Sequence, residues 1–255
     1  MLAVPEGHPL HQIRAVFFDL DDTLCAYWDA AKFALRKCFE AHGPEGVSPD
    51  EMIGFWATAF RDFCPNLREL GLYEQYLQNG EPTRTEQMRR SLLLAGCDDP
   101  DRAKRLSQTY AEVRNRSLRL FPEVPELLEQ LHGRLKLGMI TNGPADVQRQ
   151  EVVTLGLERF FDPVLIEGEM GRGKPHPQVF EHARSVVGCD PHELLFVGNS
   201  YRHDIAPVIE HGWRTFWVRR PSDVAPSAAG PEEAPDGAPM PDFVADSLEL
   251  LFPNL

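Results

Sequence analysis

Cysteine is scarce in this chain, and no two cysteines are closely spaced. Five cysteines occur among 255 residues, an odd number, and none of them forms a Cys-x-x-Cys motif. This usage makes a disulfide framework or a structural zinc site an unfavourable interpretation. Reduced thiols, and with them a cytoplasmic protein, are the simpler expectation.

Long apolar runs and an excess of positive charge are also missing. The N-terminal stretch MLAVPEGHPLHQIR lacks the apolar segment of a signal peptide, and no run approaches the length of a membrane span. The formal net charge of −13 argues against general binding to nucleic acids or to membrane surfaces. Anionic small molecules stay open as partners, because a local cation can reverse the field inside a pocket. Nothing in the sequence indicates an oligomeric state.

What the chain does contain predicts an α/β fold. It is 42% hydrophobic, enough for a sizeable core. Residues 13–20 form an apolar run typical of a buried parallel strand, and a block of helical patterns follows it. From residue 122 onward, helix and strand patterns alternate. We therefore predict a Rossmann-like, doubly wound parallel sheet from residues 1–24 and 119–255, with a helical domain inserted at 25–118.

One stretch of the predicted core does not read as packed structure. Residues 221–241 are rich in proline, alanine, glycine and acids. Such a composition favours a mobile loop. We expect this loop to interrupt the core between its last strands.

Polar side chains follow the predicted strands at their carboxyl ends. These residues are Asp19, Asp21, Asp22, Thr23, Thr141, Asn142, Lys174, Asn199 and Asp204. Because the carboxyl ends of parallel strands meet at one edge of a sheet, we expect these side chains to converge. Acids gathered around one point repel each other unless a cation lies between them, and oxygen ligands suit Mg²⁺. With Lys174 beside them, they predict a site for phosphoryl transfer.

The order and placement of these motifs strongly resemble the haloacid dehalogenase-like superfamily of hydrolases. Asp19-x-Asp21-x-Thr23 after an apolar strand is similar to its first motif, and Thr141 to its second. Lys174 in GKPHP is similar to the third motif, and VGNSYRHD to the fourth. The resemblance covers nearly the whole chain. The helical block is similar to the cap that one subfamily inserts between the first two motifs.

The resemblance implies hydrolysis of a small phosphomonoester metabolite through an aspartyl phosphate. Asp19 would be the nucleophile and Asp21 the general acid and base. Thr141, Asn142 and Lys174 would bind the phosphoryl group, and Lys174 would also neutralise charge on Asp19.

The resemblance also implies Mg²⁺ as cofactor, bound by the Asp19 carboxylate, the Asp21 backbone carbonyl and Asp204. Many members have Asp where this chain has Asn199, so one negative charge is missing from the expected site. Asn199 and Thr23 are therefore expected to support the site rather than to bind the metal.

Alternative functions of the same fold remain open. A sugar-phosphate mutase would keep the phosphate on its product, and a catalytically weak phosphate-binding protein would draw its only support from Asn199. Dehalogenase chemistry is disfavoured because it does not need Asp21. A phosphonatase would require a cap lysine, for which Lys32 and Lys37 are the early candidates.

A competing motif and a few further residues are interpreted more plainly. GEMGRGKP resembles a phosphate-binding loop, but Pro175 replaces the hydroxyl residue that such a loop needs, so we reject that interpretation. Aromatic residues at helical spacing in the cap, including Trp28, Trp56 and Phe60, are expected in its core more than against a substrate. His203 is expected in a solvated loop.

Overall fold

A six-stranded parallel sheet forms the centre of the protein in a computed structural model that describes residues 4–252. The strand order is β3-β2-β1-β4-β5-β6, and every neighbouring pair is parallel. The strands are β1 (Ala15–Phe18), β2 (Lys136–Thr141), β3 (Val164–Ile166), β4 (Leu194–Gly198), β5 (Arg214–Val218) and β6 (Phe243–Ala245). The predicted Rossmann-like sheet is confirmed. Strand β1 lies between β2 and β4, at the point where the chain reverses its direction of winding.

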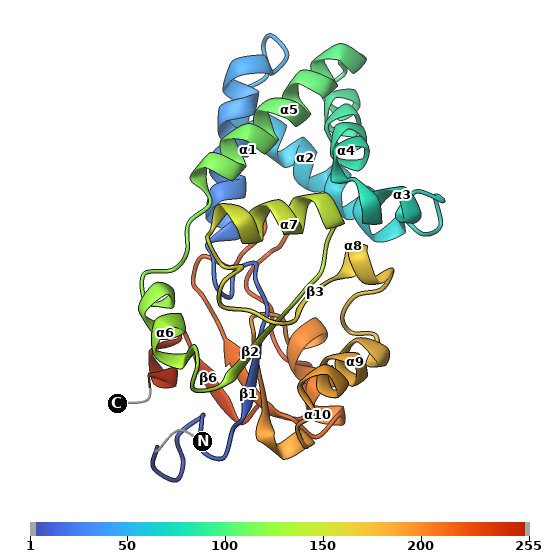
Figure 1. Cartoon of the computed structure of the whole chain (residues 1–255). Helices are drawn as coiled ribbons and strands as arrows, with labels where there is room; N and C mark the ends of the chain where they lie inside the picture. The colour runs from blue at the N-terminus through green and yellow to red at the C-terminus, as the bar shows by residue number, and fades with distance from the viewer. Residues whose placement is uncertain (1–3, 253–255) are drawn as a thin grey trace.

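The uninterrupted apolar pattern of β1 follows from burial on both faces. Val16 and Phe18 pack into one apolar cluster, and Ala15 and Phe17 pack into a second one across the sheet. A glycine is required at position 138 of β2, because a Cβ there would lie 2.2 Å from the Phe17 ring. Helices on both sides of the sheet cover these clusters (Figure 1).

The first five α-helices after β1 form a block of their own (Figure 1). They are α1 (Tyr27–His42), α2 (Pro49–Phe63), α3 (Tyr73–Gln78), α4 (Gly80–Leu94) and α5 (Pro100–Ser117). Figure 1 shows them gathered beyond the carboxyl end of the sheet. Helices α1, α2, α4 and α5 share an apolar cluster of their own, which includes Leu35, Met52 and Leu106. The division into a core and a cap domain stays a prediction.

The remaining helices connect the strands of the sheet. They are α6 (Val124–Leu131), α7 (Ala145–Thr154), α8 (Glu167–Met170), α9 (Pro177–Val187) and α10 (Ala206–Glu210). A 3₁₀ turn at Glu249–Leu251 follows β6. Within residues 4–252, no helix combines the length and the apolar character needed to cross a membrane.

The proline-rich segment, residues 221–241, contains no helix or strand but is bound at several points. The Lys32 ammonium donates to the Ser222 carbonyl oxygen at 3.2 Å, and Arg61 donates to that of Ser227 at 3.1 Å. The Tyr201 hydroxyl donates to the Pro239 carbonyl oxygen at 2.6 Å. The mobility of this segment stays a prediction.

Candidate active site

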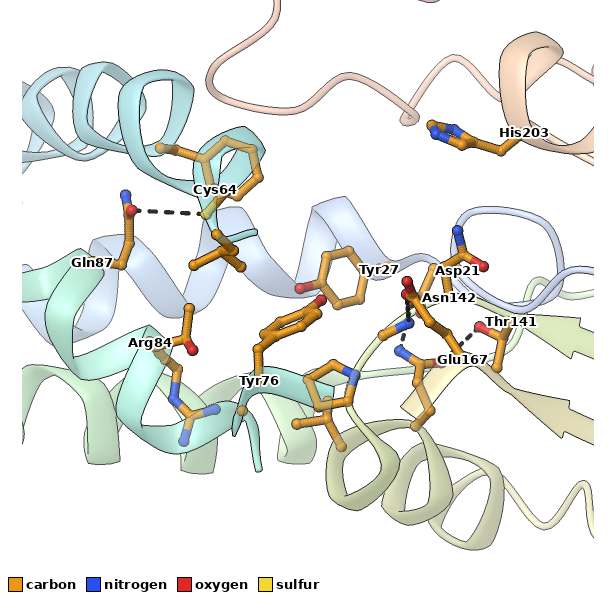
Figure 2. A pocket seen from close by; sticks show the side chains of 18 of the residues that line it. Asp21, Tyr27, Cys64, Tyr76, Arg84, Gln87, Thr141, Asn142, Glu167 and His203 are labelled. Atoms are coloured by element: carbon orange, nitrogen blue, oxygen red, sulfur yellow. Dashed lines mark hydrogen bonds between the residues drawn. The ribbon is translucent and has the colours of Figure 1, made fainter. Parts of the chain in front are cut away.

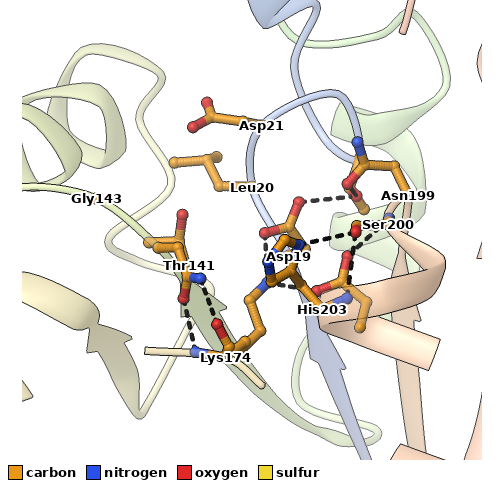
Figure 3. A network of polar contacts seen from close by, with 12 residues as sticks. Asp19, Leu20, Asp21, Thr141, Gly143, Lys174, Asn199, Ser200 and His203 are labelled. Atoms are coloured by element: carbon orange, nitrogen blue, oxygen red, sulfur yellow. Dashed lines mark hydrogen bonds and ion pairs between the residues drawn. The ribbon is translucent and has the colours of Figure 1, made fainter. Parts of the chain in front are cut away.

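Three charged side chains from distant parts of the sequence meet beside the end of β1. The Lys174 ammonium lies 2.6 Å from Asp19 Oδ1 (Figure 3). It also lies 2.6 Å from Asp204 Oδ1. All three side chains are buried. Asp19 directly follows β1, Lys174 lies in the loop after α8, and Asp204 lies in a helical turn (Tyr201–Ile205) after β4. The convergence expected from parallel strand ends is therefore present.

Burial and mutual charge perturb all three groups. Burial raises the pKa of Asp19 to about 6, although Lys174 acts to lower it. Burial also raises the pKa of Asp204. For Lys174, burial alone would lower the pKa, but Asp19 and Asp204 outweigh that effect and raise it. One ammonium is thus shared between two carboxyl groups that lie too deep for water to stabilise.

The local backbone explains why these side chains point where they do. The Asp19 N–H donates to the Val197 carbonyl oxygen at 2.9 Å, which continues the pairing of β1 with β4. The Ser200 N–H donates to Asp204 Oδ2 at 3.0 Å and holds that carboxylate. A Cβ on Gly198 would lie 2.4 Å from the same oxygen, so the end of β4 must be glycine for Asp204 to reach the site.

Asn142 positions Lys174 through its backbone. Its Nδ2 donates to the Lys174 carbonyl oxygen at 2.7 Å, and its Oδ1 accepts from the Lys174 N–H at 2.8 Å. Both ends of the Asn142 amide are therefore occupied. These contacts hold the loop that presents Lys174, and phosphate binding by Asn142 stays a prediction.

A buried glutamine joins Thr141 to Asp21. The Thr141 hydroxyl donates to Gln148 Oε1 at 2.7 Å, and Gln148 Nε2 donates to Asp21 Oδ2 at 3.1 Å. Gln148 is on α7 and is buried. An amide has a donor at one end and an acceptor at the other, so it can hold both neighbours in one arrangement. Thr141 and Asp21 are thereby fixed on the same side of the site.

A buried ion pair lies behind Asp21. Arg114 of α5 contacts Glu151 of α7 at 3.0 Å, and both side chains are almost completely buried. Burial, and next the nearby Glu151 charge, raise the pKa of Asp21 well above its ordinary value. Burial also raises the pKa of Glu151, but Arg114 favours its ionised form. Burial therefore favours the neutral form of Asp21, whereas Arg114 offsets part of that effect for Glu151.

Thr23, Asn199 and Asp22 support the site around Asp19. The Thr23 hydroxyl donates to Asp19 Oδ2 at 3.0 Å and lies 3.3 Å from Asn199 Oδ1. Asp22 accepts a hydrogen bond from the N–H of Trp28, in the first turn of α1. Asp22 thus caps a helix, and Thr23 contacts the predicted nucleophile directly.

The donor set fits a small hard cation. In residues 4–252, no three His, Cys, Asp or Glu side chains form a metal-ligand cluster. Mg²⁺, however, commonly uses only one or two carboxylates together with waters and substrate oxygens. Asp204 Oδ1 is buried, and within those residues its close polar contact is the same ammonium that holds Asp19. Two carboxylates that compete for one ammonium are suited to a divalent cation between them.

A cavity of about 650 Å³ opens from this site toward α1–α5. Aromatic side chains of those helices line it, and Figure 2 shows Tyr27 and Tyr76 among them. Trp56 and Phe60 stack on each other in the apolar cluster of these helices and also line the cavity. These two aromatic residues therefore belong to the core of the helices and also face the cavity. The volume of the cavity is in the range of small-molecule sites and is much larger than the volume of one phosphate group.

His203 and Glu167 also lie in the cavity wall. The expectation of a solvated loop was wrong for His203, which is half-buried and whose Nδ1 lies 3.1 Å from the Ser200 hydroxyl. Glu167 accepts from the Gly143 N–H at 2.9 Å and from the Tyr73 hydroxyl, which joins α3 to the loop after β2. Sequence reasoning missed Glu167, Gln148, Glu151 and Arg114, because none belongs to a motif. The polar positions within the otherwise helical patterns of α5 and α7 were the only signal.

Comparison with known proteins identifies the family. The model of the haloacid dehalogenase-like hydrolases matches residues 13–212. A phosphoserine phosphatase of Thermus thermophilus is 32% identical over 244 residues, which are 88% of this chain and 94% of that protein. A glyceraldehyde 3-phosphate phosphatase of Methanopyrus kandleri is 28% identical, with 82% and 84% covered.

Solved structures agree in fold. The magnesium-bound hydrolase YfnB of Bacillus subtilis superposes with a TM-score of 0.70 at 21% identity, covering 94% of this chain and 96% of that one. A 2-haloacid dehalogenase of Pseudomonas syringae superposes with a TM-score of 0.62 at 30% identity, with 94% and 96% covered. The family match spans strands β1 to β4, the five inserted helices and the Asp19–Lys174–Asp204 cluster, so this chain belongs to the haloacid dehalogenase-like hydrolases.

Proposed function

We propose that the protein is a Mg²⁺-dependent phosphatase that hydrolyses a small phosphomonoester metabolite through an aspartyl phosphate. The observation that carries this proposal is the shared ion pair of Lys174 with Asp19 and Asp204, with Asp21 two residues beyond the nucleophile. The phosphatases among the relatives support the same reaction class. Their different named substrates leave the metabolite itself to experiment.

Asp19 and Asp21 divide the reaction between them. A carboxylate oxygen of Asp19 attacks phosphorus, and the ester P–O bond breaks as the leaving oxygen takes the proton of Asp21. Water then attacks the phosphorus of the aspartyl phosphate, Asp21 takes up its proton, and the P–O bond to Asp19 breaks to release phosphate. The high pKa of Asp21 suits the first step, because an acid must hold its proton until the leaving group needs it.

Lys174 and the buried surroundings supply electrostatic stabilisation. The ammonium lies against Asp19, where negative charge concentrates as the phosphoryl group arrives. Gln148 holds Asp21 in place, and Asn142 holds the backbone of Lys174. Asp19, Asp204 and the Asp21 carbonyl would hold Mg²⁺, which when bound offsets the charge of the phosphoryl oxygens.

The five helices over the site are proposed to act as its cap. Their aromatic residues form one wall of the cavity, and the sheet edge forms its floor. A leaving group enclosed there would be shielded from bulk water, which strengthens the contacts with Lys174. Specificity would then depend on the cap residues that line the cavity.

Phosphate release tests this function. The purified chain is expected to release phosphate from p-nitrophenyl phosphate with Mg²⁺ and to stop when EDTA is added. Asp19→Asn should remove the activity, whereas the exposed Asp29→Asn should not. Chloride release from 2-chloropropionate tests dehalogenase chemistry, suggested by the 30% identical dehalogenase. Halide release without phosphate release would refute the proposal.

A panel of phosphorylated metabolites then addresses the substrate. It should include phosphoserine and glyceraldehyde 3-phosphate, after the relatives. Analysis of both products separates a phosphatase from a mutase, because a mutase returns the phosphate on the organic product.

A further inference from the structure

The start of the proline-rich segment lies close to the proposed cation site, because Arg220, which directly precedes it, contacts the loop after β1. Arg220, the second residue after β5, is buried and pairs with Glu123 at 2.7 Å. It also donates to the Thr23 carbonyl oxygen at 3.1 Å, beside the end of β1. The Asp223 N–H donates to the Arg220 carbonyl oxygen at 3.1 Å. Asp223 is therefore held in a turn whose anchor contacts the loop that carries Asp19.

The carboxylate of Asp223 determines how Asn199 is oriented. Asn199 Nδ2 donates to Asp223 Oδ2 at 2.8 Å. A carboxylate only accepts hydrogen bonds, so it must face the NH₂ end of the amide. Asn199 Oδ1 consequently faces the other way, 3.3 Å from the hydroxyl of Thr23. That hydroxyl contacts Asp19 at the shorter distance of 3.0 Å, so Oδ1 remains open to a further partner.

Asn199 lies at the cavity wall, and Asp223 lies behind it, on the side away from the cavity. Asn199 lines the cavity together with Asp19 and Asp204, whereas Asp223 does not. Asp223 is half-buried, so its charge is less screened than a surface charge. Had position 199 been an aspartate, two carboxylates would oppose each other at a hydrogen-bonding distance. The amide at 199 and the acid at 223 form a matched pair.

We propose that Asp223 is a positioning residue of the cation site, which fixes the Asn199 amide so that Oδ1 faces the cation, directly or through one water. The acid also returns to the site the negative charge that position 199 lacks. This inference rests on the proposed Mg²⁺-dependent function, because it concerns the affinity for that cation. It gives the start of the proline-rich segment a role in the site.

Calorimetric titration with Mg²⁺ alone, without substrate, tests the proposal on the full chain. Asp223→Asn should raise the Kd for Mg²⁺ about tenfold, as loss of a group that orients a metal ligand commonly does. Asp236→Asn is the matched control, since Asp236 is exposed in the same segment and makes no hydrogen bond or ion pair with residues 4–252. Because an exposed charge is screened, its Kd should stay within about twofold of wild type.

The exchange of the two residues provides the decisive variant. In Asn199→Asp/Asp223→Asn, the new amide at position 223 donates to the new carboxylate at position 199. The negative charge then lies at the cavity wall. Mg²⁺ binding should return to the wild-type level or exceed it, and the melting temperature without Mg²⁺ should show that the pair still folds.

Equal effects of Asp223→Asn and Asp236→Asn would overturn the inference, since only overall charge would then matter. An exchange variant as weak as Asp223→Asn would also overturn it. If wild type binds Mg²⁺ and releases phosphate while Asp223→Asn titrates like wild type, only this inference fails. If wild type binds no Mg²⁺, the proposed cation and this inference fail together.

Discussion

Removal of Arg114 is expected to destabilise the protein severely, because it leaves Glu151 without its charge partner. The Arg114 and Glu151 side chains are only 5% and 1% exposed, and their charged atoms lie 3.0 Å apart. Loss of one partner of such a pair typically costs about 3–5 kcal/mol. Arg114→Met keeps most of the apolar stem, so the main loss is the charge. The pair joins α5 to α7, and its loss should weaken the contact between the inserted helices and the sheet.

A double-mutant cycle measures this cost. Urea unfolding followed by circular dichroism should show Arg114→Met less stable by about 3–5 kcal/mol, and Arg114→Met/Glu151→Met should recover most of the loss. Arg116→Met is the control on the same helix. Its ion pair with Glu112 is 80% and 66% exposed, so its loss should change stability by less than about 0.5 kcal/mol.

The pH dependence of the variant has a definite sign. Without Arg114, burial holds the pKa of Glu151 in the folded protein above its value in the unfolded chain. Between these two pKa values, the folded state binds more protons than the unfolded state. Stability then falls as pH rises, and the penalty of Arg114→Met should be larger near pH 8 than near about pH 5. An Arg114→Met variant as stable as Arg116→Met, or single effects that simply add, would refute this reasoning.

Three further predictions concern the site itself. Because the pKa of Asp19 is about 6 without bound metal and the nucleophile must be ionised, kcat/KM at a subsaturating Mg²⁺ concentration should fall about tenfold per pH unit below that value; a kcat/KM that stays flat to about pH 4 would contradict this. Gln148→Leu should lower kcat with little change in KM and move the alkaline limb upward, since the Gln148 hydrogen bond lowers the pKa of Asp21; an unchanged pH profile would leave Gln148 only a structural role. Lys174→Met should make the melting temperature depend more strongly on Mg²⁺ than in wild type, because two buried carboxylates then lack a counter-ion. An equal Mg²⁺ shift in both proteins would show that the lysine is not their shared partner.

Motif residues were predictable because they lie at the ends of strands. The apolar run of β1 is buried on both faces, so its position in the centre of a parallel sheet could be inferred from the letters alone. The order of the strands then brings Asp19, Lys174 and Asp204 to one edge. The contact of the Asn142 side chain with the Lys174 backbone could not be predicted, since an amide can serve a ligand or a backbone loop equally well.

The sequence by itself determined the α/β fold, the order of its motifs and the acids that follow its strands, because strand periodicity and charge spacing are local properties of the chain. Only the tertiary structure decided that Gln148 joins Thr141 to Asp21, that Arg114 pairs with Glu151, and that Asp223 stands behind Asn199. Those partners are far apart in sequence and belong to helices or loops with no fixed spacing. A side chain in such an element acquires its electrostatic role from whatever the packing places beside it.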